Sequence, residues 1–357
     1  MTTAPTEPTF TSGHPDTPAP DYARFAIGFD ERDRGRWHQL IDEVIDSGRW
    51  TESTFTERFE QAWGAWNGLG TVATSSWSGG ALAALNFAQV AGTTVLCPSN
   101  TFMATPLAAV NAGANVEFVD CNRDDLCMSF EDFERKAEQH HPRAAILVHI
   151  GGHIAFESER IAAYCREHGI FLLEDCAHAH GAQWRHADGT VTKPGQYGDA
   201  GVYSFYATKT VSTGEGGMLV SGNDELIEFA RGFRNYGKPG YAVQGLNFRM
   251  SEFTAALGLL QTERMPEIVD WKNRVAAEYL DPQFAGSRLE LPEGMTSGFY
   301  KYIVFDWLER STGRVYDDPC HRIFGHQVEL PNTDWVVQHH SCPPLYYRPA
   351  DAGEGIR

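Results

Sequence analysis

The sequence predicts an α/β protein in which a mainly parallel sheet forms the large part and a smaller lobe follows it. Between about residues 68 and 224, short apolar runs alternate with helical stretches, a pattern typical of a parallel sheet covered by helices. The length of 357 residues exceeds that of one minimal domain. An apolar content of 42% provides enough surface for a buried core.

The segment before the sheet is expected to contain a flexible tail and two helices. Residues Met1 to about Asp21 are rich in Thr, Pro and Ser and offer few apolar anchors, so we expect this tail to be loose. Apolar residues then recur at helical spacing from Trp37 to Ile45, and Ser47-Gly48 ends that pattern. A second amphipathic helix is expected around Phe55 to Trp63.

The predicted strands of the sheet are short and apolar. They are Thr94–Cys97, Val116–Val119, Ala145–His149, Phe171–Glu174, Val202–Phe205 and Met218–Val220. Helices are predicted near 79–90, 104–112, 130–140 and 157–168. Gly92, Gly113 and Gly169 stand where C-terminal caps are expected.

The last part of the chain changes character. Helices are predicted from Ser251 through Leu260 and over Ile268–Tyr279, the second leading away from the core. Beyond about Asp281, alternation over Phe299–Phe305 and a Pro-rich end indicate a smaller α+β lobe. We therefore divide the chain into a tail (1–21), a large domain (22–264) and a linking helix with a small C-terminal domain (265–357).

Charge and cysteine usage exclude several classes of protein. The formal net charge of −18 disfavours a surface that binds nucleic-acid phosphates. The seven cysteines include no C-x-x-C pair and no zinc-like spacing, so we expect reduced thiols and no metal site. We find neither a long apolar run nor a signal-peptide pattern, so we expect a cytoplasmic protein without a membrane segment.

Two residue types at strand ends indicate the chemistry. Asp175 directly follows the strand Phe171–Glu174, and Lys209 follows the strand Val202–Phe205 within a Gly-rich stretch. Alone, such an acid is often a helix cap and such a lysine a surface residue. Together they form the minimal site for pyridoxal 5′-phosphate (PLP), because a lysine amine forms a Schiff base and a carboxylate keeps the pyridine nitrogen protonated.

Four linked motifs extend this hypothesis. They are Glu174–Ala182, Ser204–Lys209 with Thr213–Gly217, Arg234–Gly237, and Asn247–Glu252. With these motifs the chain resembles the DegT/DnrJ/EryC1/StrS sugar aminotransferases from about Phe29 to Gln261. The resemblance implies fold type I of the PLP-dependent transferases, which is the aspartate aminotransferase-like fold.

The resemblance also implies a role for each residue around the cofactor ring. Lys209 would carry PLP and shuttle the proton, Asp175 would pair with the pyridine nitrogen, and Ser204 would bind the phosphate. His178 would lie near the phenolic oxygen of the ring, and Ala177 would pack beneath it. Ordinary core hydrogen bonding is the alternative for His178 and is preferred for His180.

A second group of residues is implied to hold the phosphate and the ring plane. Ser78, Gly79, Gly80 and Ala81 resemble a Ser-Gly-Thr-Ala motif at a helix start, where free amides and the helix dipole bind anions. Gly80 replaces the usual threonine, so backbone amides or Ser78 would have to compensate. Phe102 would stack on the exposed ring face, and the alternative for it is a plain core role.

The resemblance further implies a homodimer with shared active sites. Asn247 would reach the cofactor phosphate of the partner subunit. Arg249 could be structural or could bind a substrate carboxylate or phosphate, and both readings stay open. Departures from the family are Glu52-Ser-Thr54 in place of a glycine-containing turn and Gly151-Gly152 in place of Tyr-Gly.

Three functions are compatible with these residues. The favoured one is an aminotransferase that moves an amino group from glutamate or glutamine to a nucleotide-linked keto-deoxysugar or a keto-cyclitol, in secondary-metabolite or surface-polysaccharide biosynthesis. A PLP-dependent elimination is the second, although the related dehydratases have histidine where this chain has Lys209. The third is a catalytically silent regulatory protein on the same scaffold, which the joint presence of Lys209, Asp175, Ser204 and His178 disfavours.

Overall fold

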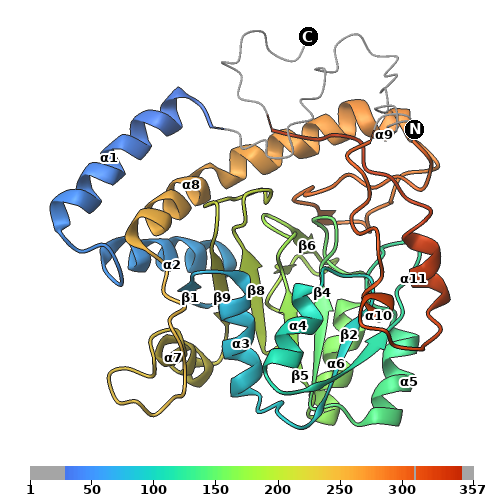
Figure 1. Ribbon diagram of the computed structural model, residues 1–357. Coiled ribbons are helices and arrows are strands. Elements are labelled where there is room, and N and C mark those ends of the chain that lie inside the picture. Colours follow the sequence, from blue (N-terminus) through green and yellow to red (C-terminus); the bar gives the residue numbers. More distant parts are fainter. Residues whose placement is uncertain (1–28, 309–310, 348–357) are drawn as a thin grey trace, which may run out of the picture.

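A seven-stranded sheet forms the centre of the molecule (Figure 1). The computed structural model describes residues 29–308 and 311–347, so the predicted tail of residues 1–21 lies outside the described residues. In sheet order the strands are β1 (Gly70–Thr74), β9 (Gly217–Ser221), β8 (Ala200–Ser204), β5 (Phe171–Asp175), β4 (Ala144–Val148), β2 (Thr94–Pro98) and β3 (Asn115–Val119). Only β9 runs against its neighbours, which confirms the mainly parallel α/β fold.

Helices cover both faces of this sheet. On one face lie α3 (Trp77–Phe87), α4 (Ala104–Asn111) and α7 (Asp224–Phe233). On the other lie α2 (Thr54–Asn67), α5 (Phe130–His140), α6 (Ser158–His168) and α8 (Glu252–Val275). In the described ranges, no helix combines the length and the apolar character that crossing a bilayer requires.

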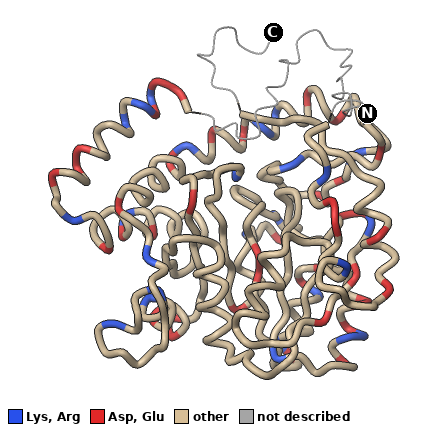
Figure 2. Tube along the Cα trace, in the orientation of Figure 1, with Lys and Arg blue, Asp and Glu red and all other residues tan. Residues whose placement is uncertain are grey.

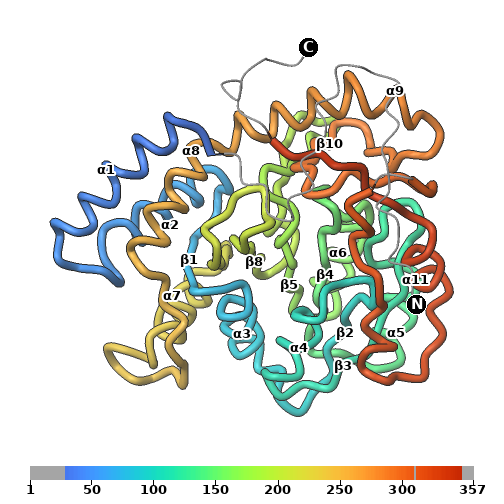
Figure 3. Tube along the Cα trace, turned by 45° about the horizontal axis from the view of Figure 1, so that its top comes forward, coloured from blue at the N-terminus to red at the C-terminus, as the bar shows by residue number. Residues whose placement is uncertain are grey.

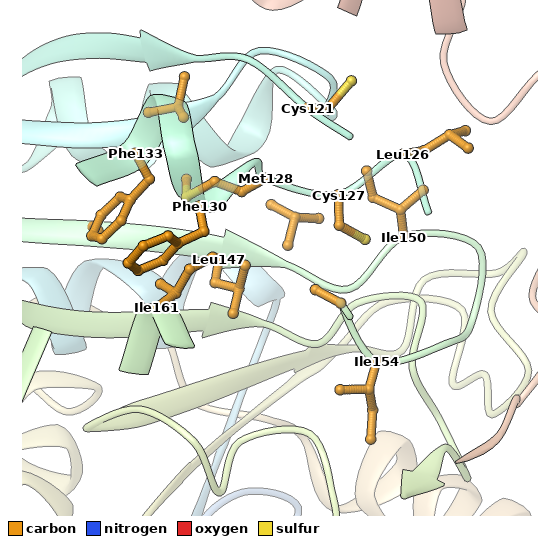
Figure 4. Packing of buried hydrophobic residues seen from close by; sticks show 14 of the residues in the cluster. Cys121, Leu126, Cys127, Met128, Phe130, Phe133, Leu147, Ile150, Ile154 and Ile161 are labelled. Atoms are coloured by element: carbon orange, nitrogen blue, oxygen red, sulfur yellow. The ribbon is translucent and has the colours of Figure 1, made fainter. Parts of the chain in front are cut away.

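The strands are buried on both faces, which explains their continuous apolar runs. Val95 and Cys97 of β2 belong to the cluster under α3 and α4, whereas Leu96 between them belongs to the opposite cluster. Successive side chains of a strand point to opposite faces, so each strand feeds two cores. Figure 4 shows this opposite cluster, in which Leu147 of β4 lies beside Phe130 of α5 and Ile161 of α6.

The helix α1 (Glu31–Ser47) extends from the body of the molecule and lies alongside α8 (Figures 1 and 3). Its predicted end is confirmed, because Gly48 caps it in the left-handed conformation at φ 63°. Figure 2 shows acidic and basic residues interspersed along α1. At its start Asp30 and Asp33 form ion pairs with Arg264 of α8, at 3.1 and 2.9 Å.

The two helices predicted over 251–260 and 268–279 are one helix, α8, and that prediction of a break was wrong. The helix continues through Pro266, which lies inside it. In the same stretch Arg264 forms ion pairs with Asp30 and Asp33. A π-helical segment (Ala276–Leu280) and the short α9 (Asp281–Gln283) follow. The domain division predicted at residue 264 therefore falls within α8.

The C-terminal part is more irregular than the sequence suggested. Its regular elements are β10 (Met295–Thr296), α10 (Cys320–Ile323) and α11 (Pro331–Val336), and β10 joins β6 (Gln183–Arg185) and β7 (Val191–Thr192) in a small sheet. The alternating stretch Phe299–Phe305 forms no regular strand, and only Val304 makes isolated bridges, with Arg288 and Ser341. Its backbone bonds to loops, as when Lys301 N donates to Gly151 O at 2.8 Å.

One buried carboxylate joins α8 to α2. Ser53 precedes α2 without a side-chain cap, and Glu252 takes over this function from α8. Its oxygens accept hydrogen bonds from the backbone amides of Ser53, Phe55 and Thr56 at 3.0, 2.6 and 3.2 Å. Because a carboxylate satisfies amides that a helix start leaves unpaired, this contact fixes α2 against α8.

We expect Glu252→Gln to destabilise the protein by about 3 kcal/mol, because an amide group would face buried N–H donors that lose their acceptor. Urea unfolding followed by tryptophan fluorescence measures this loss. The matched control is Glu57→Gln, an exposed acid in the first turn of the same helix, which should change stability by less than about 0.5 kcal/mol. Equal effects of the two variants would contradict the assigned role.

Candidate active site

The site begins with Asp175, the last residue of β5. Its side chain is 5% exposed. Thr105 of α4 donates its hydroxyl to Oδ2 at 2.8 Å, and the amide of Ala177 donates to Oδ1 at 3.1 Å. Burial raises the pKa of the Asp175 carboxyl above its ordinary value, and the hydrogen bonds from Thr105 and Ala177 and the charge of Lys209 oppose this shift. The carboxylate is thus buried and able to accept a cationic partner.

Glu174, the preceding residue, points to the opposite face of the strand and is structural. Oε1 accepts hydrogen bonds from the amides of Tyr197 and Gly198, and Oε2 accepts one from Gly195. His149 also bonds to Oε2 through Nε2 at 2.8 Å. The two adjacent carboxylates therefore have different roles. Glu174 holds the surrounding loops, whereas Asp175 faces the site.

Lys209 follows β8, the parallel neighbour of β5, so both residues emerge at the same edge of the sheet. Its Nζ lies 4.5 Å from the ring centroid of Tyr300. Burial lowers the pKa of Lys209 to about 8, the charge of Asp175 opposes this shift, and the charge of Lys301 adds to it. About a tenth of Lys209 is therefore a neutral, nucleophilic amine at pH 7, far more than for a lysine of ordinary pKa.

Tyr300 belongs to the C-terminal segment, and the sequence did not identify it. Its ring stacks on His178 with centroids 4.0 Å apart, and its hydroxyl lies 3.1 Å from that of Thr208. A Cβ atom on Gly152 would come within 2.6 Å of Tyr300 N. Gly152 thus lets this segment approach the site, and the departure from the family pattern lies at Gly151, where a Cβ would come within 2.6 Å of Ile303 Cδ1.

The two histidines of the Glu174–Ala182 motif differ in their surroundings. His178 is buried and accepts a hydrogen bond at Nδ1 from Gly151 N, at 3.4 Å. Burial keeps its pKa well below the ordinary value, so its ring is neutral. His180 lies in the core, accepts from Val211 N at 3.1 Å and stacks on Phe205. This placement agrees with the core reading preferred for His180.

The end of β8, the start of β9 and the N-terminus of α3 meet at one place. Ser204 ends β8 and pairs with Gly217 of β9. A Cβ on Gly217 would lie 2.4 Å from Ser76 O and 2.7 Å from Trp77 N, so the N-terminus of α3 is directly beside Ser204. Ser76 caps this helix, and the following Ser78 is exposed. The hydroxyls and first-turn amides suit a phosphate group.

The structure explains why Gly80 replaces a threonine. A Cβ on Gly80 would lie 2.9 Å from Val202 Cγ1, and one on Gly79 would lie 2.9 Å from Phe248 Cβ. Both glycines and Ala81 are buried against neighbouring elements. These residues therefore pack α3 onto the sheet, and only their backbone and the exposed Ser78 can face a ligand.

The remaining predicted residues are exposed or partly exposed. Phe102 follows β2 and is 61% exposed, so the core alternative for it is wrong in this chain. Asn247 is exposed and accepts a hydrogen bond from Arg249 N at 3.1 Å. Arg249 donates to Asn235 Oδ1 at 2.7 Å and lies 3.9 Å from Glu52, contacts that favour its structural reading.

Two buried groups elsewhere combine metal-binding residue types, namely Asp125, Cys127 and His153, and His149, Glu174 and Cys176. Their polar atoms already have protein partners. Asp125 accepts from the amides of Cys127 and Phe156 at 2.9 and 2.8 Å, and Glu174 is engaged as described above. Hydrogen bonding accounts for both groups.

Known proteins resemble this chain in sequence and in fold. A sequence profile of the DegT/DnrJ/EryC1/StrS aminotransferase family matches residues 32–305. GDP-perosamine synthase of Vibrio cholerae is 31% identical over 283 residues, covering 75% of this chain and 73% of that enzyme. A putative L-glutamine:3-amino-2,3-dideoxy-scyllo-inosose aminotransferase of Micromonospora echinospora is 35% identical over 239 residues, covering 63% of this chain and 53% of that protein.

Among solved structures, the aminotransferase TlmJ from Streptoalloteichus hindustanus superposes on this chain with a TM-score of 0.80 at 27% identity. The superposition covers 90% of this chain and 92% of that structure. The similarity therefore extends over the sheet, its helices and most of the C-terminal part.

We expect Lys209 of the cofactor-free protein to react with an amine reagent with a midpoint near pH 8, because only the neutral amine reacts and its pKa is about 8. At pH 7 its neutral fraction should exceed that of an ordinary lysine by roughly two orders of magnitude. Peptide mass spectrometry of samples labelled between pH 6 and 10 measures this. Asp175→Asn should move the midpoint lower, since the carboxylate raises the pKa; a midpoint near 10.5 in the parent protein would contradict the assignment.

Proposed function

The chain belongs to the DegT/DnrJ/EryC1/StrS aminotransferase family, and on this premise we propose that it transfers an amino group from glutamate or glutamine to a keto sugar, with PLP bound on Lys209. Family membership establishes the enzyme class, which is that of the PLP-dependent aminotransferases. The observation that carries the proposal is the placement of the buried Asp175 at the end of β5 and of the partly buried Lys209 after β8, the parallel neighbour of β5.

The residues present fit the cofactor at three points. Asp175 supplies a buried carboxylate for a protonated pyridine nitrogen. Ser204 and the start of α3 supply hydroxyl and amide donors for the phosphate. Lys209 supplies an amine with a lowered pKa for the aldehyde. Ala177, whose amide is fixed on Asp175, and the exposed Phe102 are proposed to bracket the ring.

When bound, PLP acts as an electron sink that stabilises negative charge on the substrate carbon. The protein supplies binding and proton transfer. Lys209 is proposed to carry the proton between substrate and cofactor atoms, and a pKa near 8 suits this role because both protonation states are accessible near neutral pH. Neutral His178, held by Gly151 and stacked on Tyr300, is proposed to lie near the phenolic oxygen.

The proposed acceptor is a nucleotide-linked keto-deoxysugar or a keto-cyclitol. Names among the relatives support both classes, since they include GDP-perosamine synthase and an L-glutamine-dependent scyllo-inosose aminotransferase. These names also suggest surface-polysaccharide or secondary-metabolite biosynthesis. Elimination is the second PLP reaction considered for this site, and the presence of Lys209 in place of histidine favours transamination.

We also propose that the protein is a cytoplasmic homodimer. Large apolar side chains are exposed on the described chain near Asn247, among them Leu246 at 63% and Tyr241 at 69%. A partner subunit would cover such residues and would bring its own Asn247 to the cofactor phosphate. All seven cysteines are free and buried, which suits a reducing compartment.

We expect the purified holoprotein to show the visible absorbance of lysine-bound PLP, and Lys209→Ala to abolish it with unchanged circular dichroism. Borohydride reduction followed by mass spectrometry should place the cofactor on Lys209. Retention of the same spectrum by Lys209→Ala would sink this assignment.

Adding glutamate to the holoprotein should yield 2-oxoglutarate and convert the cofactor to its amino form. Chromatography of the keto acid and the absorbance change measure this half-reaction. If neither glutamate nor glutamine produces it, the donor or the reaction differs from the one proposed.

A mixing experiment tests the shared active sites. Lys209→Ala and Asn247→Ala dimers should each be nearly inactive at limiting cofactor, whereas a 1:1 mixture after subunit exchange should recover about one quarter of parental activity. Each mixed dimer then combines an intact Lys209 with an intact Asn247 in one of its two sites. No recovery, despite mixed dimers detected by native mass spectrometry, would place the whole site within one chain.

A further inference from the structure

Lys272 of α8 is a buried lysine for which the proposed chemistry has no use. Its residue is 6% exposed. Nζ donates to Phe299 O at 2.9 Å and to Thr210 Oγ1 at 3.1 Å. Within residues 29–308 and 311–347, no carboxylate forms an ion pair with it. Burying an amine without an acid costs free energy. The burial of Lys272 therefore calls for an explanation, which its two hydrogen-bond acceptors can provide.

The two acceptors belong to segments that flank the active-site amine. Thr210 directly follows Lys209, and Phe299 directly precedes Tyr300, whose ring lies beneath Lys209 Nζ. Two further contacts run between the same segments. Thr208 and Tyr300 join their hydroxyls at 3.1 Å, and Thr210 donates to Gly298 O at 3.4 Å. The loop that carries Lys209 is thus tied on both sides of the lysine.

The segment 298–301 is itself firmly placed, so it can serve as a fixed support. Gly298 N donates to Gly152 O, and Lys301 N donates to Gly151 O, both at 2.8 Å. A Cβ on Gly298 would lie 1.9 Å from His180 O, so the backbones touch directly. Asn273, the neighbour of Lys272 on α8, holds Ser297 O at 2.8 Å.

We propose that Lys272 is a positioning residue for Lys209, which bridges the lysine loop to the 298–301 segment and thereby fixes the direction of the reactive amine. This rests on the proposed function, because the amine must meet the cofactor and the substrate carbon in a defined geometry. Small displacements of a reacting group cost large factors in rate. The side-chain amino group of Lys272 acts only through its two hydrogen bonds and touches no reacting atom.

A buried lysine with an ordinary structural role offers the comparison. Lys136 of α5 is 4% exposed, pairs with Asp132 at 2.8 Å and donates to Phe118 O. It contacts none of the active-site segments. Lys136→Met therefore removes a lysine of similar burial without altering the Lys209 loop, and it serves as the matched control.

The experiment uses holoprotein with the substitutions Lys272→Met, Thr210→Val, both together, and Lys136→Met. The readouts are the pH titration of the cofactor's visible absorbance and the rate of the glutamate half-reaction. We expect Lys272→Met and Thr210→Val each to shift the titration and to slow the half-reaction by about tenfold, with KM for glutamate nearly unchanged. The double variant should be no slower than the worse single one, since both break the same bridge.

A merely structural Lys272 would give another pattern. Lys272→Met and Lys136→Met would lower the unfolding temperature alike and leave the titration and the half-reaction unchanged, and this result overturns the proposal. Thr210→Val keeps the test decisive if Lys272→Met does not fold, because a parental rate and titration in that variant also overturn it.

Failure of the proposed function would be recognised separately, by parental protein that binds no PLP or takes no amino group from either donor. The reactivity of Lys209 with an amine reagent in cofactor-free protein then tests the bridge alone. An altered pH midpoint in Thr210→Val and Lys272→Met, but not in Lys136→Met, would support it, and identical midpoints in all variants would overturn it.

Discussion

The structure depends on keeping a carboxylate and an amine close together in a buried place without complete mutual neutralisation. Because β5 and β8 are parallel neighbours, Asp175 and Lys209 leave the sheet at one edge. Burial raises the pKa of the Asp175 carboxyl and lowers the pKa of the Lys209 amine. Both groups can therefore still form a new bond or hydrogen bond with a ligand. Neutral donors from Thr105 and Ala177 hold the carboxylate, and a cationic donor there would have removed that capacity.

The C-terminal segment 298–301 also contributes to the site, although it is distant from Asp175 and Lys209 in the sequence. Tyr300 reaches Lys209 and His178 because Gly152 and Gly298 let backbones meet without side chains between them. Gly152 and Tyr300 thus depend on each other, because the segment around Tyr300 approaches the site only where position 152 has no side chain. A bulkier residue at position 152 would exclude the segment and leave Lys209 without its aromatic neighbour.

The features that depend on local sequence pattern could be predicted from the sequence. The features that depend on packing between distant segments could not. The parallel strands, α5 and the pair Asp175–Lys209 followed from apolar runs and motif spacing. The continuity of α8 was missed because the apolar pattern lapses between Leu260 and Ile268, although the helix continues through this stretch and Pro266. Tyr300 and Lys272 carry no local signal, since an aromatic residue and a lysine are ordinary in composition. Only the fold shows that both lie against the Lys209 loop.

The unbroken helix α8 links two contacts that depend on rotation as well as distance. Near its start Glu252 faces the beginning of α2, and further along Lys272 faces Thr210. Each residue of an α-helix turns by about 100°, so one residue inserted or deleted between these points would turn one of the two side chains away from its partner. In relatives that keep both contacts, insertions and deletions should therefore be confined to the loops outside α8. The residues of this helix then provide a gap-free reference for aligning the sequences of these relatives.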